Sequence, residues 1–305
     1  MIPDFPKFKK LEFSDKADVE FFTNKYPPYS DFNFTSMWCW DTHSKMRISK
    51  LNSNLVVRFN DYLTKDKMFC SFFGNGDPTD TAVKLLDYAV KENLEPVLKY
   101  IPQFTIVGID QDQVSVEEER DHFDYILDNR KLIDYKGRPL HNHANFKKRF
   151  TEIHGNNLDI KLLNMSNGNH KNHIDTLNQL WSKNKTIQGK EVISELEEKA
   201  IERIFDLGKE SDSFIIVSIF HNDKMIGFTI DELLSGEYSI RHFMKADVAF
   251  KGVYSYLVSE SAKYSLETGR TYVNIEQDLG LLGMRQAKKS FEPATLLKKY
   301  TIGYK

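Results

Sequence analysis

Residues 213 to 245 contain three runs of mainly apolar residues that are separated by short turn signals. The turn signals are His221-Asn222-Asp223 and Ser235-Gly236. Apolar and β-branched runs between such turns are typical of strands joined by hairpins. The stretch "SFIIVSIFHNDKMIGFTIDELLSGEYSIRHFMK" therefore predicts a three-stranded antiparallel meander, so the fold must contain an antiparallel sheet.

Helical patterns lie on both sides of this meander. Two helices are predicted before it, in "HIDTLNQLWSKN" and "SELEEKAIERIFDLG". A long helix is predicted after it, in "GVYSYLVSESAKYSLETG", where Gly269 is the expected glycine stop. The strand "LDIKLLN" precedes this set and the strand "TYVNIEQ" follows it. The second half of the chain therefore predicts the order strand, two helices, meander, helix and strand.

The first half predicts the same order. Two helices are expected in "SDKADVEFFTNKY" and "DFNFTSMWCWD", with Asp31 as the N-cap of the second. Strand pairs follow, with Asn52-Ser53-Asn54 as one turn, and "TDTAVKLLDYAVKENL" predicts an amphipathic helix. The 305 residues are enough for two domains. We expect an α+β (mixed α/β) fold with domains 1–150, which ends in a basic connecting segment, and 151–305. Each domain is expected to be a mostly antiparallel mixed sheet flanked by helices.

The composition excludes a disordered chain and provides no overall attraction to nucleic acid. Hydrophobic residues make up 40% of the chain, which is enough to bury a core, and the formal net charge is −2. Any surface that binds an anion must therefore be local. Cys39 and Cys70 form no C-x-x-C pair, so we expect free buried thiols in a reducing compartment and no zinc site.

The chain is expected to be soluble and cytoplasmic. Its start, "MIPDFPKFKK", has no apolar segment of the kind found in signal peptides. The longest clear apolar run, Phe214 to Phe220, is only about a third of the roughly 20 residues that a spanning helix needs. Without a transmembrane segment, the protein would reach a lipid only through peripheral contact with an anionic membrane surface.

The order of elements in each half is similar to that of GNAT acyltransferase folds. Two stretches, "DYILDNRKLIDYKGRPLHNHANFKKRF" and "YVNIEQDLGLLGMRQAKKSFEPATLLKKY", resemble the phosphatidylglycerol lysyltransferase C-terminal-domain family. The resemblance covers nearly the whole chain and implies two tandem GNAT-like domains. The best-known members transfer an aminoacyl group from charged tRNA to the head group of phosphatidylglycerol. Those members carry transmembrane helices ahead of the catalytic part, whereas this chain resembles a stand-alone soluble member.

The loop in "ADVAFKGVYSYLV" corresponds to the loop that holds the pyrophosphate of coenzyme A in GNAT enzymes. The resemblance places Lys251, Gly252 and Val253 at the positions whose backbone N–H groups would bind that anion. Two positions depart from the Q/R-x-x-G-x-G/A pattern: Ala249 replaces Gln or Arg, and Tyr254 replaces a small residue. The bulk of Tyr254 favours aminoacyl-tRNA over acyl-CoA as the donor. The alternative interpretation is that Gly252 only begins a helix.

Polar residues follow the strand "TYVNIEQ". Strand alternation places Tyr272, Asn274 and Glu276 on one face, which would open into the reaction cleft of a GNAT fold. We expect Glu276 to act as the general base. Tyr254 and Tyr272 are the expected hydrogen-bond donors to the oxyanion or the leaving group. In the alternative interpretation, Glu276 pairs with Arg285 or Lys289 and only holds the loop.

Two basic segments are candidates for binding the phosphates of tRNA. The first lies within residues 130–149, and the second is a helix whose basic residues share one face opposite an apolar stripe of Met284, Ala287 and Phe291. Their anion-binding candidates are Lys147, Lys148, Arg149, Arg285, Lys288 and Lys289. The alternatives are solvated faces or salt bridges within the chain.

These features lead to one hypothesis with two alternatives. The chain is expected to move an acyl or aminoacyl group from aminoacyl-tRNA to an amine or hydroxyl acceptor, such as a lipid head group. We expect no tightly bound cofactor and no metal, and no G-x-S-x-G motif indicates a covalent intermediate. The alternatives are an acetyl-CoA-dependent N-acetyltransferase with acyl-CoA as the donor, and a non-catalytic binding protein.

Overall fold

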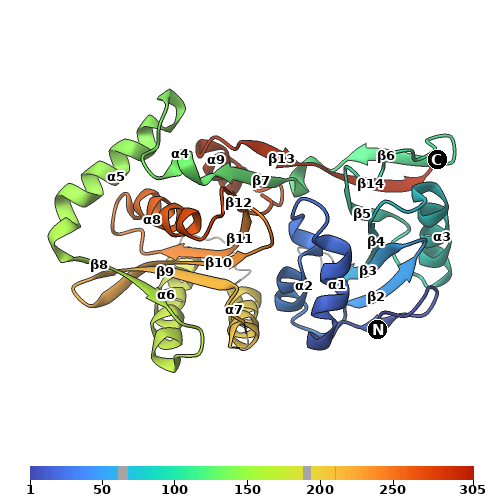
Figure 1. The fold of residues 1–305 in the computed structure, drawn as a ribbon, viewed down its shortest axis with the longest axis horizontal. Coiled ribbons are helices and arrows are strands. Elements are labelled where there is room, and N and C mark those ends of the chain that lie inside the picture. Colours follow the sequence, from blue (N-terminus) through green and yellow to red (C-terminus); the bar gives the residue numbers. More distant parts are fainter. Residues whose placement is uncertain (61–67, 188–193, 210) are drawn as a thin grey trace. The chain divides into compact units, whose positions relative to one another are not determined.

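The expected fold class is confirmed by a computed structural model that describes residues 1–60, 68–187, 194–209 and 211–305. The fold is mixed α+β, with two mostly antiparallel sheets flanked by helices (Figure 1). The chain divides into two compact units. Unit 1 comprises Met1–Asp124, Gln277–Leu281 and Leu296–Lys305, and unit 2 comprises Tyr125–Glu276 and Leu282–Thr295.

This division differs from the expected boundary at residue 150. The first unit ends at Asp124 and is completed by the C-terminal residues, because strand β14 (Lys299–Tyr304) pairs with two strands of the first sheet. The segment after Asp124 belongs to unit 2, where strand β7 (Asp124–Asp128) pairs with strand β12 (Tyr272–Asn274). Periodicity within the sequence cannot reveal such long-range strand pairing.

The first sheet has seven strands in the order β1-β2-β3-β4-β5-β14-β6. All neighbours are antiparallel except β4 and β5, which pair in parallel. The strands are β1 (Lys9–Lys10), β2 (Arg47–Leu51), β3 (Asn54–Asn60), β4 (Met68–Phe73), β5 (Leu98–Pro102) and β6 (Val114–Glu118), with β14. The helices of unit 1 are η1 (Phe13–Asp15), α1 (Lys16–Thr23), η2 (Ser30–Phe32), α2 (Phe34–Trp40), α3 (Pro78–Lys91) and η3 (Arg120–His122).

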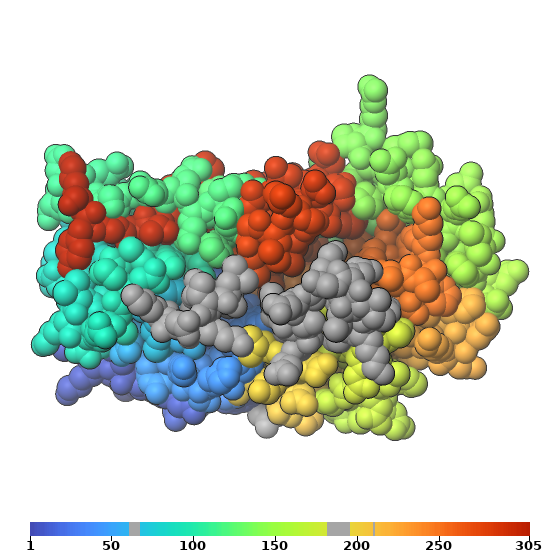
Figure 2. All heavy atoms as spheres, turned by 180° about the vertical axis from the view of Figure 1, so that it is seen from behind, coloured from blue at the N-terminus to red at the C-terminus, as the bar shows by residue number. Residues whose placement is uncertain are grey.

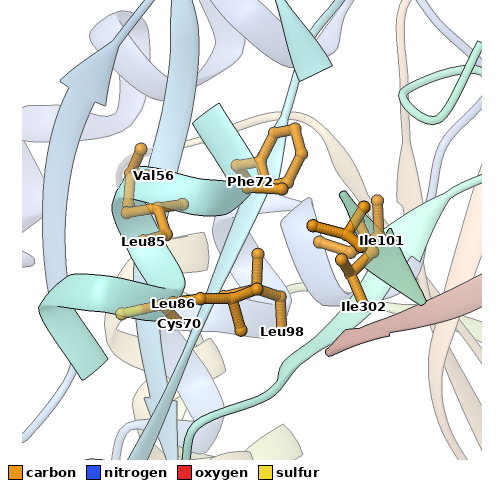
Figure 3. Close-up of a cluster of buried hydrophobic side chains, with 10 residues drawn as sticks. Val56, Cys70, Phe72, Leu85, Leu86, Leu98, Ile101 and Ile302 are labelled. Carbon is orange, nitrogen blue, oxygen red and sulfur yellow. The ribbon is translucent and has the colours of Figure 1, made fainter. Parts of the chain in front are cut away.

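Helix α3 covers this sheet through its apolar stripe. Leu85 and Leu86 are fully buried in a cluster with residues of β3, β4, β5 and β14, and Figure 3 shows Leu85 beside Val56 and Leu86 beside Leu98. Cys70 lies in the same cluster, and burial raises the pKa of its thiol to about 12. Cys39 is buried as well, and neither cysteine forms a disulfide, as expected from the sequence.

The second sheet has the order β13-β7-β12-β11-β10-β9-β8. Its further strands are β8 (Leu158–Leu163), β9 (Phe214–His221), β10 (Lys224–Leu233), β11 (Tyr238–Ala246) and β13 (Thr295–Leu297). The predicted meander is confirmed as β9, β10 and β11, which are antiparallel, whereas β12 joins β11 in parallel. The helices of unit 2 are α4 (Asn129–Leu132), η4 (Arg138–Leu140), α5 (His141–His154), η5 (Gly155–Asn157), α6 (Gly168–Ile187), α7 (Ser194–Gly208), α8 (Val253–Glu267) and α9 (Leu282–Ser290).

A buried ion cluster joins β14 to the rest of unit 1. The Lys299 ammonium contacts carboxylate oxygens of Asp31 and of Asp124, the latter at 2.8 Å, and all three side chains are fully buried. Burial disfavours the charged ammonium, but the two carboxylates outweigh that effect and raise the pKa of Lys299. Asp31 is therefore an ion-pair partner, and the expected N-cap role is wrong, because Asn33 accepts the hydrogen bond from the Ser36 N–H at the start of α2.

We predict that Lys299→Met destabilises unit 1 by about 3–5 kcal/mol, because two buried carboxylates lose their counter-ion. Urea unfolding followed by the fluorescence of Trp38 and Trp40 measures this change. Lys298→Met is the matched control. The Lys298 side chain is 41% exposed in its pair with Glu118, so its loss should destabilise unit 1 far less than the loss of Lys299. Equal effects of the two substitutions would show that the buried cluster does not stabilise unit 1.

Candidate active site

A β-bulge in β11 sets the directions of the charged side chains in the second sheet. Ile230 of β10 pairs with Phe243, whereas the next residue, Asp231, pairs with Arg241, so His242 is an additional residue in β11. Arg241 donates to Ser261 of α8, and Met244 packs against clusters that include Val258 and Leu257 of α8, although residues three apart face opposite sides of a regular strand. The bulge thus changes the alternation at His242.

His242 lies between two carboxylates. Its Nε2 atom is 3.2 Å from Oε2 of Glu232 on β10, and its Nδ1 atom is 3.4 Å from Oε1 of Glu276. The side chains of His242 and Glu232 are each 2% exposed, whereas Glu276 is 20% exposed. Burial alone lowers the pKa of His242, but the bonds and charges of both carboxylates outweigh it and raise the pKa to about 9. At neutral pH the site therefore holds an imidazolium between two carboxylates, of which only Glu276 reaches solvent.

Glu276 follows the point where the strand ladder ends. Strand β12 pairs with β11 at Tyr238, Ser239 and Ile240, and among the described residues no strand pairs with that edge of β11 from there to Ala246. The backbone of Glu276 has a φ of +59°, a left-handed conformation that is unfavourable for a residue other than glycine.

Surrounding groups hold Glu276 in this conformation. Its N–H donates to the Asn274 Oδ1 atom at 2.6 Å, and its carbonyl accepts from the Tyr125 N–H at 3.3 Å. The preceding carbonyl, that of Ile275, accepts from the Lys288 ammonium of α9. Strained backbone held by several bonds is a common property of functional sites.

The two tyrosines named from the sequence have different surroundings. The Tyr254 hydroxyl, in the first turn of α8, accepts a bond from the Ala246 N–H at 3.3 Å, and burial raises the pKa of Tyr254. Tyr272 lies at the start of β12, where its ring stacks on Tyr238 at 5.5 Å, with the Arg130 guanidinium 5.8 Å above it. Tyr254 therefore anchors the end of β11, and Tyr272 packs at the opposite end of the short β12.

The glycine loop is shaped by helix packing. Gly252 has a φ of +97°, and a Cβ atom there would lie 2.6 Å from the Phe146 carbonyl oxygen of α5. Only glycine permits this approach of α5 to the start of α8. Val253 is buried, and Lys251 is exposed. Gly252 therefore does more than begin a helix, because α5 requires a glycine at this position whatever else the loop binds.

The basic candidates divide into engaged and exposed side chains. The Lys147 ammonium donates to the Ile133 carbonyl at 2.7 Å, and burial lowers its pKa. Lys148, Arg149 and Lys289 are exposed, and the Lys148 ammonium lies 3.8 Å from the Glu152 carboxylate in an exposed ion pair. Lys288 is bound to the Ile275 carbonyl, and Arg285 is half-buried.

The expected apolar stripe of α9 is formed in part. Phe291 is buried and Met284 is half-buried, but Ala287 is exposed. No residue of α9 itself is buried, and the orange-red part of the chain that includes α9 lies at the surface in Figure 2. The helix thus rests on the unit through few contacts, while its polar side faces solvent.

Sequence reasoning missed Glu232 and His242. It also missed Lys245, whose ammonium is 2.7 Å from Glu197 and 3.2 Å from the centroid of the Trp181 ring. A signal was present, because "TIDELL" and "SIRHFMK" place charged residues inside strands that are otherwise apolar. Buried charges in proteins are usually paired.

We predict that His242 titrates near pH 9, which NMR of the histidine ring protons can measure, and that Glu232→Gln lowers this pKa. The ordinary pKa of histidine is about 6.5, so the folded state binds the proton more tightly. The stabilisation is therefore fully present below about pH 6.5 and is lost as the pH rises to about 9, with a total of at most about 3 kcal/mol.

Unfolding experiments provide the second measurement of the same property. The stability of the wild type should decline between pH 6.5 and 9, and His242→Gln should remove most of this decline. The exposed His141 offers the matched control, because His141→Gln should leave the decline unchanged. A His242 that titrates at 6.5 or below would contradict the ion cluster.

None of the helices in the described part of the chain has the length and apolar character needed to cross a membrane. Comparisons with known proteins agree with the fold. A protein of unknown function from Bacteroides thetaiotaomicron VPI-5482 has a TM-score of 0.82 at 23% identity, and the alignment covers 100% of both chains. The structure of L-PGS from Bacillus licheniformis has a TM-score of 0.65 at 12% identity over 100% of this chain and 94% of the other. FemX has a TM-score of 0.57 at 9% identity over 98% of this chain and 97% of the other.

A search of curated proteins finds no match. The family model described as "Phosphatidylglycerol lysyltransferase, C-terminal" matches residues 23–303, which is nearly the whole sequence. The matched range therefore includes residues of both compact units. The chain belongs to the phosphatidylglycerol lysyltransferase C-terminal family.

Proposed function

We propose that this protein transfers an aminoacyl group from aminoacyl-tRNA to an amine or hydroxyl acceptor. The observation that carries the proposal is the Glu276 carboxylate, which is partly exposed, strained in its backbone and backed by the buried His242 and Glu232. Family membership supports a transferase, because the family is described by a lysyltransferase activity.

In this proposal Glu276 is the general base. The acceptor nitrogen or oxygen attacks the ester carbonyl of the donor, and Glu276 takes the proton that the acceptor loses. A bond forms between the acceptor and the carbonyl carbon, and the bond to the ribose oxygen breaks. The protonated Glu276 returns its proton to that oxygen as it leaves, so Glu276 ends as a carboxylate again. His242, charged at neutral pH, keeps the carboxylate of Glu276 in place and is a positioning residue.

Tyr254 is the better candidate of the two tyrosines for stabilising the oxyanion or the leaving oxygen. Its oxygen accepts bonds from the Ala246 N–H and from Trp181, which leaves its own hydrogen for donation. The residue lies in the first turn of α8, next to the part of β11 that β12 does not cover. Tyr272 is the first residue of β12, so it would contribute only by holding the start of that strand through its stack on Tyr238.

Aminoacyl-tRNA is favoured over acyl-CoA as the donor. Helix packing accounts for Gly252, so this glycine is no evidence for a pyrophosphate site. The exposed Lys148, Arg149 and Lys289 provide positive charge for RNA phosphates. The Val253 N–H already donates to the Phe250 carbonyl at 3.1 Å, and the Lys288 ammonium already binds the Ile275 carbonyl. Lys251 and Arg285 remain candidates for contacts with anionic groups of the donor. One acceptor that fits this proposal is the head group of an anionic lipid, which the protein would reach by peripheral contact with a membrane.

We predict that Glu276→Gln lowers the rate of transfer by about 10²- to 10⁴-fold, because the amide cannot accept a proton. Transfer of a labelled amino acid from charged tRNA to a panel of lipid, peptide and small-amine acceptors measures this rate. Glu267→Gln, at an exposed position near the end of α8, is the matched control and should retain full activity. Equal activity of both variants would contradict the base role.

The donor is tested separately by calorimetry. Acetyl-CoA should not bind at micromolar concentration, whereas charged tRNA should bind with an affinity that falls as salt rises. Micromolar binding of acetyl-CoA would support the N-acetyltransferase alternative. Failure of transfer with every acceptor, together with harmless Glu276→Gln in the cell, would support a non-catalytic protein.

A further inference from the structure

Unit 1 contains a groove of about 600 Å³ that has no part in the proposed transfer step. One wall is formed by Phe21, Phe22, Lys25 and Tyr26, in and just after α1. The floor is formed by the turn after β2, at Asn52 and Ser53, and by the residues that follow β4. The groove has the size of pockets that bind small organic groups.

The floor is held by close contacts between the two turns. Asn52 and Ser53 have φ values of 50° and 63°, which fit a tight hairpin turn. A Cβ atom on Gly76 would lie 1.7 Å from the Asn52 carbonyl oxygen, so the second turn packs directly on the first. The Gly76 N–H also donates to the Asn54 Oδ1 atom at 2.9 Å. The floor is therefore formed without a ligand.

The wall combines an exposed aromatic ring with positive charge. Phe21 is 65% exposed, and its ring meets the edge of Phe22 at 5.5 Å. The Lys25 ammonium lies 4.1 Å from the centroid of the Phe21 ring. Tyr26 is stacked on Phe104 at 3.9 Å, which fixes the end of this wall. The exposed ring and the ammonium beside it are therefore both accessible to a ligand in the groove.

A second ammonium lies on the rim. Lys50 is 3.4 Å from Asp4, whose side chain is 88% exposed, and an ion pair this exposed is weak. Lys50 can therefore turn to another anion at little cost. The lining thus offers an aromatic face for a planar ring and two ammonium groups against one exposed carboxylate, which is complementary to a planar group that carries a phosphate.

We propose that this groove binds a nucleotide of single-stranded RNA, with the base against Phe21 and the phosphate near Lys25 and Lys50. Base stacking on an aromatic side chain with lysines along the backbone is the general mode of binding single strands. The identification of that RNA with the tRNA donor rests on the proposed function. The binding itself does not, because it requires neither Glu276 nor a transfer reaction.

The test uses a fluorescein-labelled single-stranded hexaribonucleotide and fluorescence anisotropy with the full chain. Phe21→Ala and Lys25→Gln should each weaken binding at least fivefold, as expected for loss of a stacked base or a phosphate contact. The matched controls are Phe13→Ala, at an exposed ring outside the groove, and Lys84→Gln, at an exposed lysine of α3. Both controls should bind as the wild type does. Urea unfolding verifies that each variant is folded.

The outcomes separate this proposal from the proposed function. Glu276→Gln should bind the hexaribonucleotide like the wild type. The binding result can therefore be interpreted even if the transfer assay fails. Equal binding by Phe21→Ala, Lys25→Gln and the controls would overturn the groove as the site. Competition by adenosine monophosphate or coenzyme A at the same concentration as the strand would show a free-nucleotide site and overturn RNA as the occupant. Affinity that is independent of salt would overturn the phosphate contact.

Discussion

The insertion of β14 between β5 and β6 is the constraint on which the organisation of the chain depends. The last residues of the sequence occupy the interior of the first sheet, so unit 1 cannot be completed until the whole chain is present. Lys299 strengthens this closure, because its ammonium compensates two buried carboxylates that come from the first 124 residues. The chain consequently consists of two units that are interleaved in sequence.

The interleaving of the two units also explains the surroundings of Glu276. Residues up to Glu276 complete unit 2, and Gln277–Leu281 belong to unit 1, where Asp278 is fully buried and paired with Arg120. Glu276 therefore stands at the end of a strand whose continuation leaves the sheet. Its strained backbone is stabilised by Asn274 and Tyr125, and the bulge in β11 supplies His242 as its partner. The position of the Glu276 carboxylate thus follows from strand geometry.

Much of the fold could be predicted, because hairpins and helix ends depend on neighbouring residues. The meander is confirmed, and Gly269, with a φ of +81°, follows the end of α8 as expected. The role of Asp31 was wrong because its partner is 268 positions away. In the candidate site, Glu276 could be named from its place after a strand. His242 was marked only as a charged residue inside an apolar strand, and its pairing with Glu276 could not be predicted, since a bulge is set by the register between strands.

The order of elements, the buried thiols and the acidic residue at a strand end were all readable in the linear chain, because each is a property of short segments. The pairing of charges was decided by the folded molecule alone. Glu276 had basic neighbours in sequence, but its partner in space is His242, and Lys288 instead binds the Ile275 carbonyl. Burial determines these choices, because a charge removed from water must be paired with whichever group the backbone brings within reach.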